Sequence, residues 1–152
     1  MENKQKSIAP EILILTEFGR RDRSAAEIAL RMATCLGTDI LLLNAMTAAE
    51  RRFDEDDPIA ETDCTAETDR LRSLCKDGKV NIRGLVVSGE LWDNVRELEE
   101  SRNIIMVVMG GRPAVDDYGY FCSDVERIIR SSAAPVLVIP EKCIKMANIC
   151  QT

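Results

Sequence analysis

The 152-residue sequence contains no histidine. Nucleophilic catalysis by a Ser-His or Cys-His pair, general-base catalysis by histidine and metal binding through imidazole are therefore excluded. The remaining residue types form no nucleophile–base pair and no carboxylate pair whose geometry the spacing defines. We therefore predict that the chain is not an enzyme and has no metal site.

Basic residues are in the minority, with 20 Lys and Arg against 26 Asp and Glu and a formal net charge of -6. This balance excludes a dominant basic surface, so we expect no nucleic-acid partner. No apolar run approaches the roughly 20 residues of a membrane span, and the polar residues 1–6 do not resemble a signal peptide. We expect a cytoplasmic protein without a membrane span.

Clustered cysteines are also lacking. The six cysteines are scattered at positions 35, 64, 75, 122, 143 and 150, with no C-x-x-C pair. Zinc sites need clustered ligands, and disulfide frameworks belong to secreted proteins. We interpret the cysteines as reduced thiols that pack as small hydrophobic side chains.

Short, continuous apolar runs are what the sequence does contain. Continuous rather than alternating hydrophobicity is typical of strands buried on both faces, as in a parallel sheet covered by helices. The five runs are residues 12–15, 40–43, 85–87, 104–108 and 136–139.

The segments between these runs have helical periodicity. Ser24 with Glu27, and Ser123 with Glu126, have the spacing of capping boxes, which predicts that each serine is a helix N-cap. The apolar positions that we assign to these helices are Ala26, Ala29, Leu30, Ala33 and Leu36, then Leu71, Leu74 and Cys75, then Leu91, Val95 and Leu98, and finally Val125, Ile128 and Ile129. We expect Trp92 to lie in or near the core.

Strands and helices thus alternate along the whole chain. With right-handed crossovers, this order predicts an α/β fold, a three-layer α/β/α sandwich with a five-stranded parallel sheet. We expect one domain at residues 10–140, an N-terminal arm at 1–9, a polar loop at 46–61 and a C-terminal tail at 141–152.

In such sheets ligands bind beyond the carboxyl ends of the strands, where the strand order reverses. The loop after the first run carries Arg20, Arg21 and Arg23, and the loop after the fourth carries Arg112. Four guanidinium groups suit a phosphate or a carboxylate. The alternative is that they are solvated loop charges paired with Glu17, Asp22, Asp116 and Asp117.

Four segments carry a resemblance to a known family. They are EILILTEFG with the helix after it, GTDILLLNA, VVSGELWDNVRELEESRNIIMVVMGG and, most specifically, SDVERIIRSSAAPVLVIP. Over residues 10–140 the chain resembles the universal stress protein (UspA-like) family. The resemblance implies a Rossmann-like sheet of order 3-2-1-4-5, in which the loops after strands one and four flank one crevice.

Some members of this family bind ATP in that crevice, with a G-x2-G-x9-G-[ST] pattern after strand four and an Asp at the end of strand one. This sequence keeps Gly110 and Ser123, has Pro113 and Cys122 in place of two glycines, and has Glu17 in place of the Asp. The resemblance thus implies a degenerate nucleotide site for ATP or AMP with Mg²⁺. Its candidate residues are Thr16, Glu17, Ala45, Met109, Gly110, Gly111, Arg112, Ser123 and Asp124.

Two functions stay open. The first is a non-catalytic module in stress response that forms a homodimer through the final strand, Val136 to Ile139, and contacts a further protein partner. The second is a sensor that binds ATP, AMP or another anion in the crevice, with no hydrolysis or only weak ATP hydrolysis. Cys122 is either a redox-sensitive thiol beside a helix N-terminus or a buried, inert one.

Overall fold

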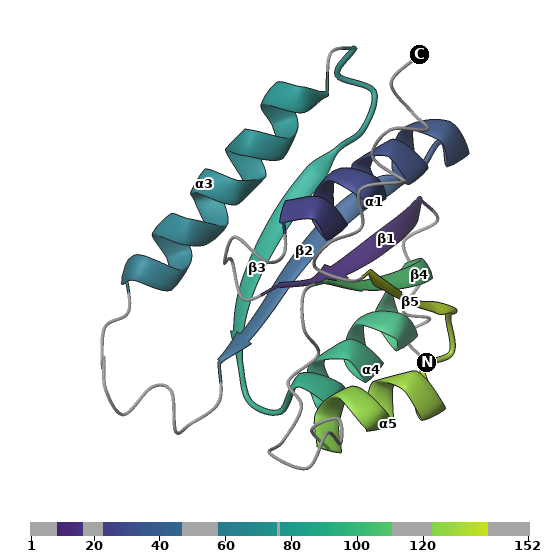
Figure 1. Cartoon of the computed structure of the whole chain (residues 1–152). Coiled ribbons are helices and arrows are strands. Elements are labelled where there is room, and N and C mark those ends of the chain that lie inside the picture. Colours follow the sequence, from purple (N-terminus) through teal and green to yellow (C-terminus); the bar gives the residue numbers. More distant parts are fainter. Residues whose placement is uncertain (1–8, 17–22, 47–57, 76, 111–122, 140–152) are drawn as a thin grey trace, which may run out of the picture.

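A five-stranded parallel sheet forms the middle of the molecule (Figure 1). The computed structural model describes residues 9–16, 23–46, 58–75, 77–110 and 123–139. The strand order is β3-β2-β1-β4-β5, which confirms the order expected for the fold. The strands are β1 (Pro10–Leu15), β2 (Asp39–Met46), β3 (Ile82–Ser88), β4 (Asn103–Gly110) and β5 (Val136–Ile139).

Two helices cover each face of this sheet, so the three-layer prediction is confirmed (Figure 1). On one face lie α1 (Arg23–Leu36) and α3 (Pro58–Leu74), and on the other lie α4 (Leu91–Ser101) and α5 (Ser123–Ser131). Consecutive strands are parallel, so the helix between them carries the chain back to the end of the sheet at which the next strand begins.

The central strands β1 and β2 are buried on both faces, as their continuous apolar runs predict. Ile12 and Ile14 pack toward α1 and α3, whereas Leu13 and Leu15 pack toward α4 and α5. All four side chains are at most 6% exposed. Burial of each stabilises the fold by roughly 1.5–3 kcal/mol relative to an exposed side chain.

The edge strand β3 does not follow this prediction. Leu85 is 36% exposed, and Val86 and Val87 are only half-buried. The reason is that α3 packs on the face of β3 that contains Gly84, whereas Leu85 points to the other face.

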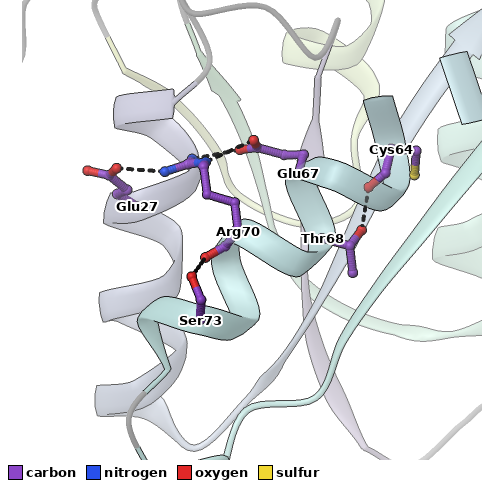
Figure 2. Close-up of polar contacts among 6 residues, drawn as sticks. All are labelled: Glu27, Cys64, Glu67, Thr68, Arg70 and Ser73. Carbon is purple, nitrogen blue, oxygen red and sulfur yellow. Dashed lines mark hydrogen bonds and ion pairs between the residues drawn. The ribbon is translucent and has the colours of Figure 1, made fainter. Parts of the chain in front are cut away.

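Gly84 allows the close approach of α3 to β3. A Cβ atom at this position would overlap Cys64 Sγ and would lie 2.8 Å from Thr68 Oγ1. The Thr68 hydroxyl in turn donates a hydrogen bond of 2.7 Å to the Cys64 carbonyl, within α3 (Figure 2).

Three side chains that we predicted to be inward are exposed instead. Ile129 is 42% exposed because its neighbour Ile128 is fully buried, and successive helical residues face different directions. Leu36 and Leu74 are 56% and 47% exposed, since each is the last residue of its helix. The predictions for Val95, Leu91, Leu98 and Trp92 are confirmed, because all four belong to or pack against the core cluster.

The helix starts agree with the predicted ones to within one residue, since α1 begins at Arg23 and α5 begins at Ser123. Both ends of the expected loop at 46–61 belong to regular elements instead, because β2 extends to Met46 and α3 begins at Pro58. Proline suits the first helical position because its missing N–H would have no partner within the helix.

One arginine joins the two helices on the α1 and α3 face (Figure 2). Arg70 of α3 forms a bidentate pair with Glu67 at 2.7 and 2.9 Å, and its Nη1 lies 2.8 Å from Glu27 Oε1 on α1. Hydrogen bonding to Glu67, and secondarily to Glu27, raises the pKa of Arg70. The charged cluster thereby fixes α3 beside α1.

Candidate functional site

The carboxyl ends of β1 and β4 lie side by side at the middle of the sheet. Leu15 pairs with Met109 in the parallel register, so Thr16 and Gly110 are neighbours at the ends of these strands. The Thr16 N–H donates a hydrogen bond of 3.0 Å to the Leu43 carbonyl, which ties this edge to β2 as well. The topology therefore brings Thr16, Met109 and Gly110 to the same end of the sheet.

Ala45 lies on the next strand. Leu15 of β1 pairs with Leu43 of β2, and Ala45 follows Leu43 by two residues. Ala45 therefore lies at the same end of the sheet as Thr16, where the strands end. Its neighbour Asn44 is half-buried on β2 and was missed by the sequence analysis. The signal was available, since Asn44 is the polar residue that directly follows the apolar run 40–43.

Two of these residues are largely enclosed. Thr16 is 8% exposed and Met109 is 7% exposed. The Met109 side chain packs in the core cluster between the sheet and the helices α4 and α5. It therefore belongs to the core. Strand alternation places Thr16, Asn44 and Gly110 on the opposite face, with Ile14, Leu42 and Val108.

The first turn of α5 contributes Ser123 and Asp124. Because α5 precedes β5 in a parallel crossover, its N-terminus is at the same end of the sheet as the carboxyl ends of the strands. A helix N-terminus presents unpaired backbone N–H groups and a partial positive charge, and both favour an anion.

The remaining candidate residues lie outside the described part of the chain. They are Glu17, Gly111 and Arg112, and the same holds for Arg20, Arg21, Pro113 and Cys122. The expected N-terminal arm and C-terminal tail fall largely outside it as well.

The polar groups at the carboxyl ends of these strands belong to Thr16, Asn44 and the backbone of Gly110. Within the described ranges no group of three or more Cys, Asp or Glu side chains could hold a metal ion. No helix in these ranges is long and apolar enough to cross a membrane.

An ion pair lies at the other end of the sheet, where the strands begin. Arg102, which follows α4, forms a bidentate pair with Glu11 at the start of β1, at 2.6 and 2.9 Å. Hydrogen bonding to Glu11 raises the pKa of Arg102, so this guanidinium stays charged.

Comparison with known proteins places this fold in a family. The family model described as "Universal stress protein family" matches residues 10–140. A search of curated proteins finds no match.

Solved structures agree with the family model. A universal stress protein in complex with cAMP has a TM-score of 0.64 at 16% identity, covering 89% of this chain and 99% of that one. A universal stress protein from Archaeoglobus fulgidus has a TM-score of 0.66 at 17% identity, covering 87% and 93%. One from Archaeoglobus fulgidus in complex with dAMP has a TM-score of 0.57 at 13% identity, covering 86% and 96%.

Proposed function

This chain belongs to the universal stress protein family, and we propose that it is a non-catalytic stress-response module that binds an adenine nucleoside monophosphate. The binding site would be the carboxyl edge of β1 and β4. The observation that carries the proposal is the adjacency of Thr16 and Gly110, at the point where the strand order reverses. Two relatives with this fold are universal stress proteins in complex with cAMP and with dAMP.

The loop composition favours a short phosphate group over a triphosphate. Pro113 and Cys122 stand where ATP-binding members have glycines, and proline has no N–H to donate to a phosphate. A monophosphate needs fewer donors. The N-terminus of α5 would supply backbone N–H groups, and Arg112, a candidate from the sequence, would supply its guanidinium. ATP with Mg²⁺ is the alternative ligand. Binding measurements with each nucleotide distinguish it from AMP.

The test is a comparison of thermal unfolding and calorimetric titration with AMP, cAMP and ATP, each with and without Mg²⁺. A ligand at about 100 times its dissociation constant stabilises the fold by roughly 2.7 kcal/mol. We expect a clear rise in Tm with AMP or cAMP that does not depend on Mg²⁺. The Arg112→Ala variant should lose most of this rise, and Arg96→Ala, an exposed arginine on α4, should keep it.

Two outcomes would contradict this assignment. Stabilisation by Mg·ATP alone would favour a triphosphate-binding sensor. The absence of any shift with all three nucleotides would leave the dimeric module described next as the working function.

A second part of the proposal is a homodimer that forms through β5. This strand lies at the edge of the sheet, pairs with β4, and has three half-buried apolar residues, Val136, Leu137 and Val138. An apolar edge strand presents backbone groups that a second copy can pair with.

Analytical ultracentrifugation tests the dimer directly. We expect a dimer at micromolar concentration and a monomer for Val138→Lys, because a charge on an edge strand opposes pairing. Val86→Lys on β3, the other edge, is the matched control and should leave the dimer intact. A monomeric parent protein would exclude this part of the proposal.

We also propose a cytoplasmic location. Cys35, Cys64 and Cys75 are free thiols in the described structure, as is typical of a reducing compartment. Cell fractionation tests this assignment.

A further inference from the structure

The strand β3 lies at one edge of the sheet, and among the described strands it pairs with β2 alone (Figure 1). It is seven residues long, against four for β5 at the other edge. The Ile40 N–H donates a hydrogen bond of 2.9 Å to the Asn81 carbonyl, so this carbonyl faces β2. The backbone groups of successive strand residues point to opposite sides, so those of Ile82, Gly84 and Val86 point away from β2. Such a row of N–H and C=O groups is a template for another strand.

The middle of this outer edge is open to solvent. Gly84 is exposed, although α3 packs so closely on its face that a Cβ atom would overlap Cys64 Sγ. A glycine has only backbone atoms, so the exposed surface is the backbone itself. Leu85, the next residue, is 36% exposed and adds apolar surface that a pairing strand would cover. An open edge with an exposed apolar side chain favours association.

Arg72, near the end of α3, covers the beginning of this edge. Its Nη2 donates a hydrogen bond of 2.7 Å to the Ile82 carbonyl, which is one of the outward-facing groups. Its Nη1 lies 3.5 Å from Asp69 Oδ1, one turn earlier in α3. The Arg72 side chain is 56% exposed, so these polar contacts hold it rather than burial in the core. The guanidinium therefore occupies the position that the N–H of an added strand would need.

We propose that this contact is autoinhibitory: the Arg72 side chain masks the β3 edge and prevents its pairing with β3 of a second copy of the chain. A second copy fits this edge, since a two-fold axis brings the same outward-facing groups of both copies together in antiparallel order. To pair, each copy has to break the hydrogen bond between Arg72 and Ile82. Pairing also brings two like charges to one interface, and both effects oppose association.

The mask is important because the sheet has two edges. Pairing through one edge closes a dimer, whereas pairing through both edges links the chains into an open-ended array. The proposal does not depend on the β5 dimer proposed above. In a monomeric chain the mask prevents a β3 dimer, and in a β5 dimer it prevents the dimers from joining.

Sedimentation velocity tests the mask, with variants built on Val138→Lys, because a charge on β5 opposes pairing through that edge. Adding Arg72→Ala should produce a species of twice the mass of Val138→Lys alone. We expect its dissociation constant to be at least about tenfold lower, since a hydrogen bond to a charged group is worth roughly that factor or more. Alanine is a strong helix former and Arg72 is exposed, so the variant should fold, which thermal unfolding checks. Arg72→Met, which keeps the apolar stem without a donor, is a second variant with the same expected result.

Two further variants locate the effect. Arg96→Ala removes the same charge from α4 and should leave the size of the Val138→Lys protein unchanged. Adding Leu85→Lys to Arg72→Ala should restore that size, because a charged side chain on an edge strand opposes pairing. Amide hydrogen exchange of the associated protein should be slower at residues 84–88 and unchanged in β1.

Three results would each overturn the proposal. They are an unchanged size for both Arg72→Ala and Arg72→Met, the same increase in size with Arg96→Ala, and an increase that Leu85→Lys does not reverse. A Val138→Lys protein that is still dimeric contradicts the β5 dimer and not the mask, because each variant is compared with the size of that background.

Discussion

Glu11 and Arg102 are 91 residues apart in the sequence and form a bidentate ion pair at the amino edge of the sheet. The Glu11 side chain is 4% exposed and that of Arg102 is 25% exposed. The pair joins the start of β1 to the connection between α4 and β4.

The two halves of this pair should respond differently to mutation. Arg102→Met leaves a buried carboxylate without its partner, and removing one member of a buried pair costs about 3–5 kcal/mol. Because Arg102 is partly exposed to water and its charge is screened, we expect a loss of about 2 kcal/mol, which is below that range. Glu11→Gln keeps the shape and should lose less. Urea unfolding of both variants measures this difference, and equal losses would argue against a buried uncompensated charge.

The arginine in this pair contributes no pH dependence near neutrality. The pKa of Arg102 is raised above its ordinary value, so its stabilising contribution is fully present below the pKa of the unfolded state and is lost only as the pH rises through the pKa of the folded state. We therefore expect the difference in unfolding free energy between the parent protein and Arg102→Met to stay constant from neutral to mildly alkaline pH. A difference that shrinks over this interval would contradict the assignment.

Gly84→Ala should destabilise the fold by overpacking. The new methyl group would overlap Cys64 Sγ, and forcing an extra carbon into a packed site costs about 1–3 kcal/mol. Cys64→Ala in the same chain removes the overlapping atom, so the double variant should recover part of the loss. Thermal unfolding of the single and double variants gives the coupling, and strictly additive losses would contradict a direct clash.

Arg70→Met should loosen α3 from α1. The pair with Glu27 is partly exposed, at 25% for Arg70 and 42% for Glu27, so we expect a loss of only about 0.5–1 kcal/mol. The loss should fall at high salt, because partly exposed charges are screened. Glu27→Gln is the matched control, since it removes the contact between the helices and leaves the pair of Arg70 with Glu67. A loss for Arg70→Met that is insensitive to salt would mean that packing, not charge, is involved.

Glu99→Gln should weaken the turn that leads into β5. Glu99 accepts hydrogen bonds of 2.5 Å from the Ser132 hydroxyl and 2.6 Å from the Ala133 N–H. Hydrogen bonds to charged groups contribute about 1.5–3 kcal/mol each, but both sites are partly exposed, so we expect a total loss of about 1–2 kcal/mol. Faster hydrogen exchange at Val136 to Ile139, with β1 unchanged, would confirm a local effect. Uniform acceleration across the sheet would contradict it.

Much of the fold was predictable because it depends on short-range patterns. The apolar runs that became β1 and β2 needed no tertiary information, since a strand with no polar position must be covered on both faces. The positions of Thr16 and Gly110 followed from the same logic, because parallel strands end at one edge. The candidate site was less predictable, since Glu17 and Arg112 belong to segments of the sequence in which no periodic pattern specifies a conformation, and both lie outside the described residues.

The sequence by itself determined the layers of this protein, the direction of its strands and the absence of histidine chemistry, because composition and hydrophobic period decide these properties locally. Tertiary structure alone decided that Leu85 is exposed, that Glu11 meets Arg102, and that Arg72 contacts the Ile82 carbonyl. These three relationships depend on where α3 lies across the sheet and on how distant strands align. Such long-range geometry is set by the packing of the whole chain and not by any segment of it.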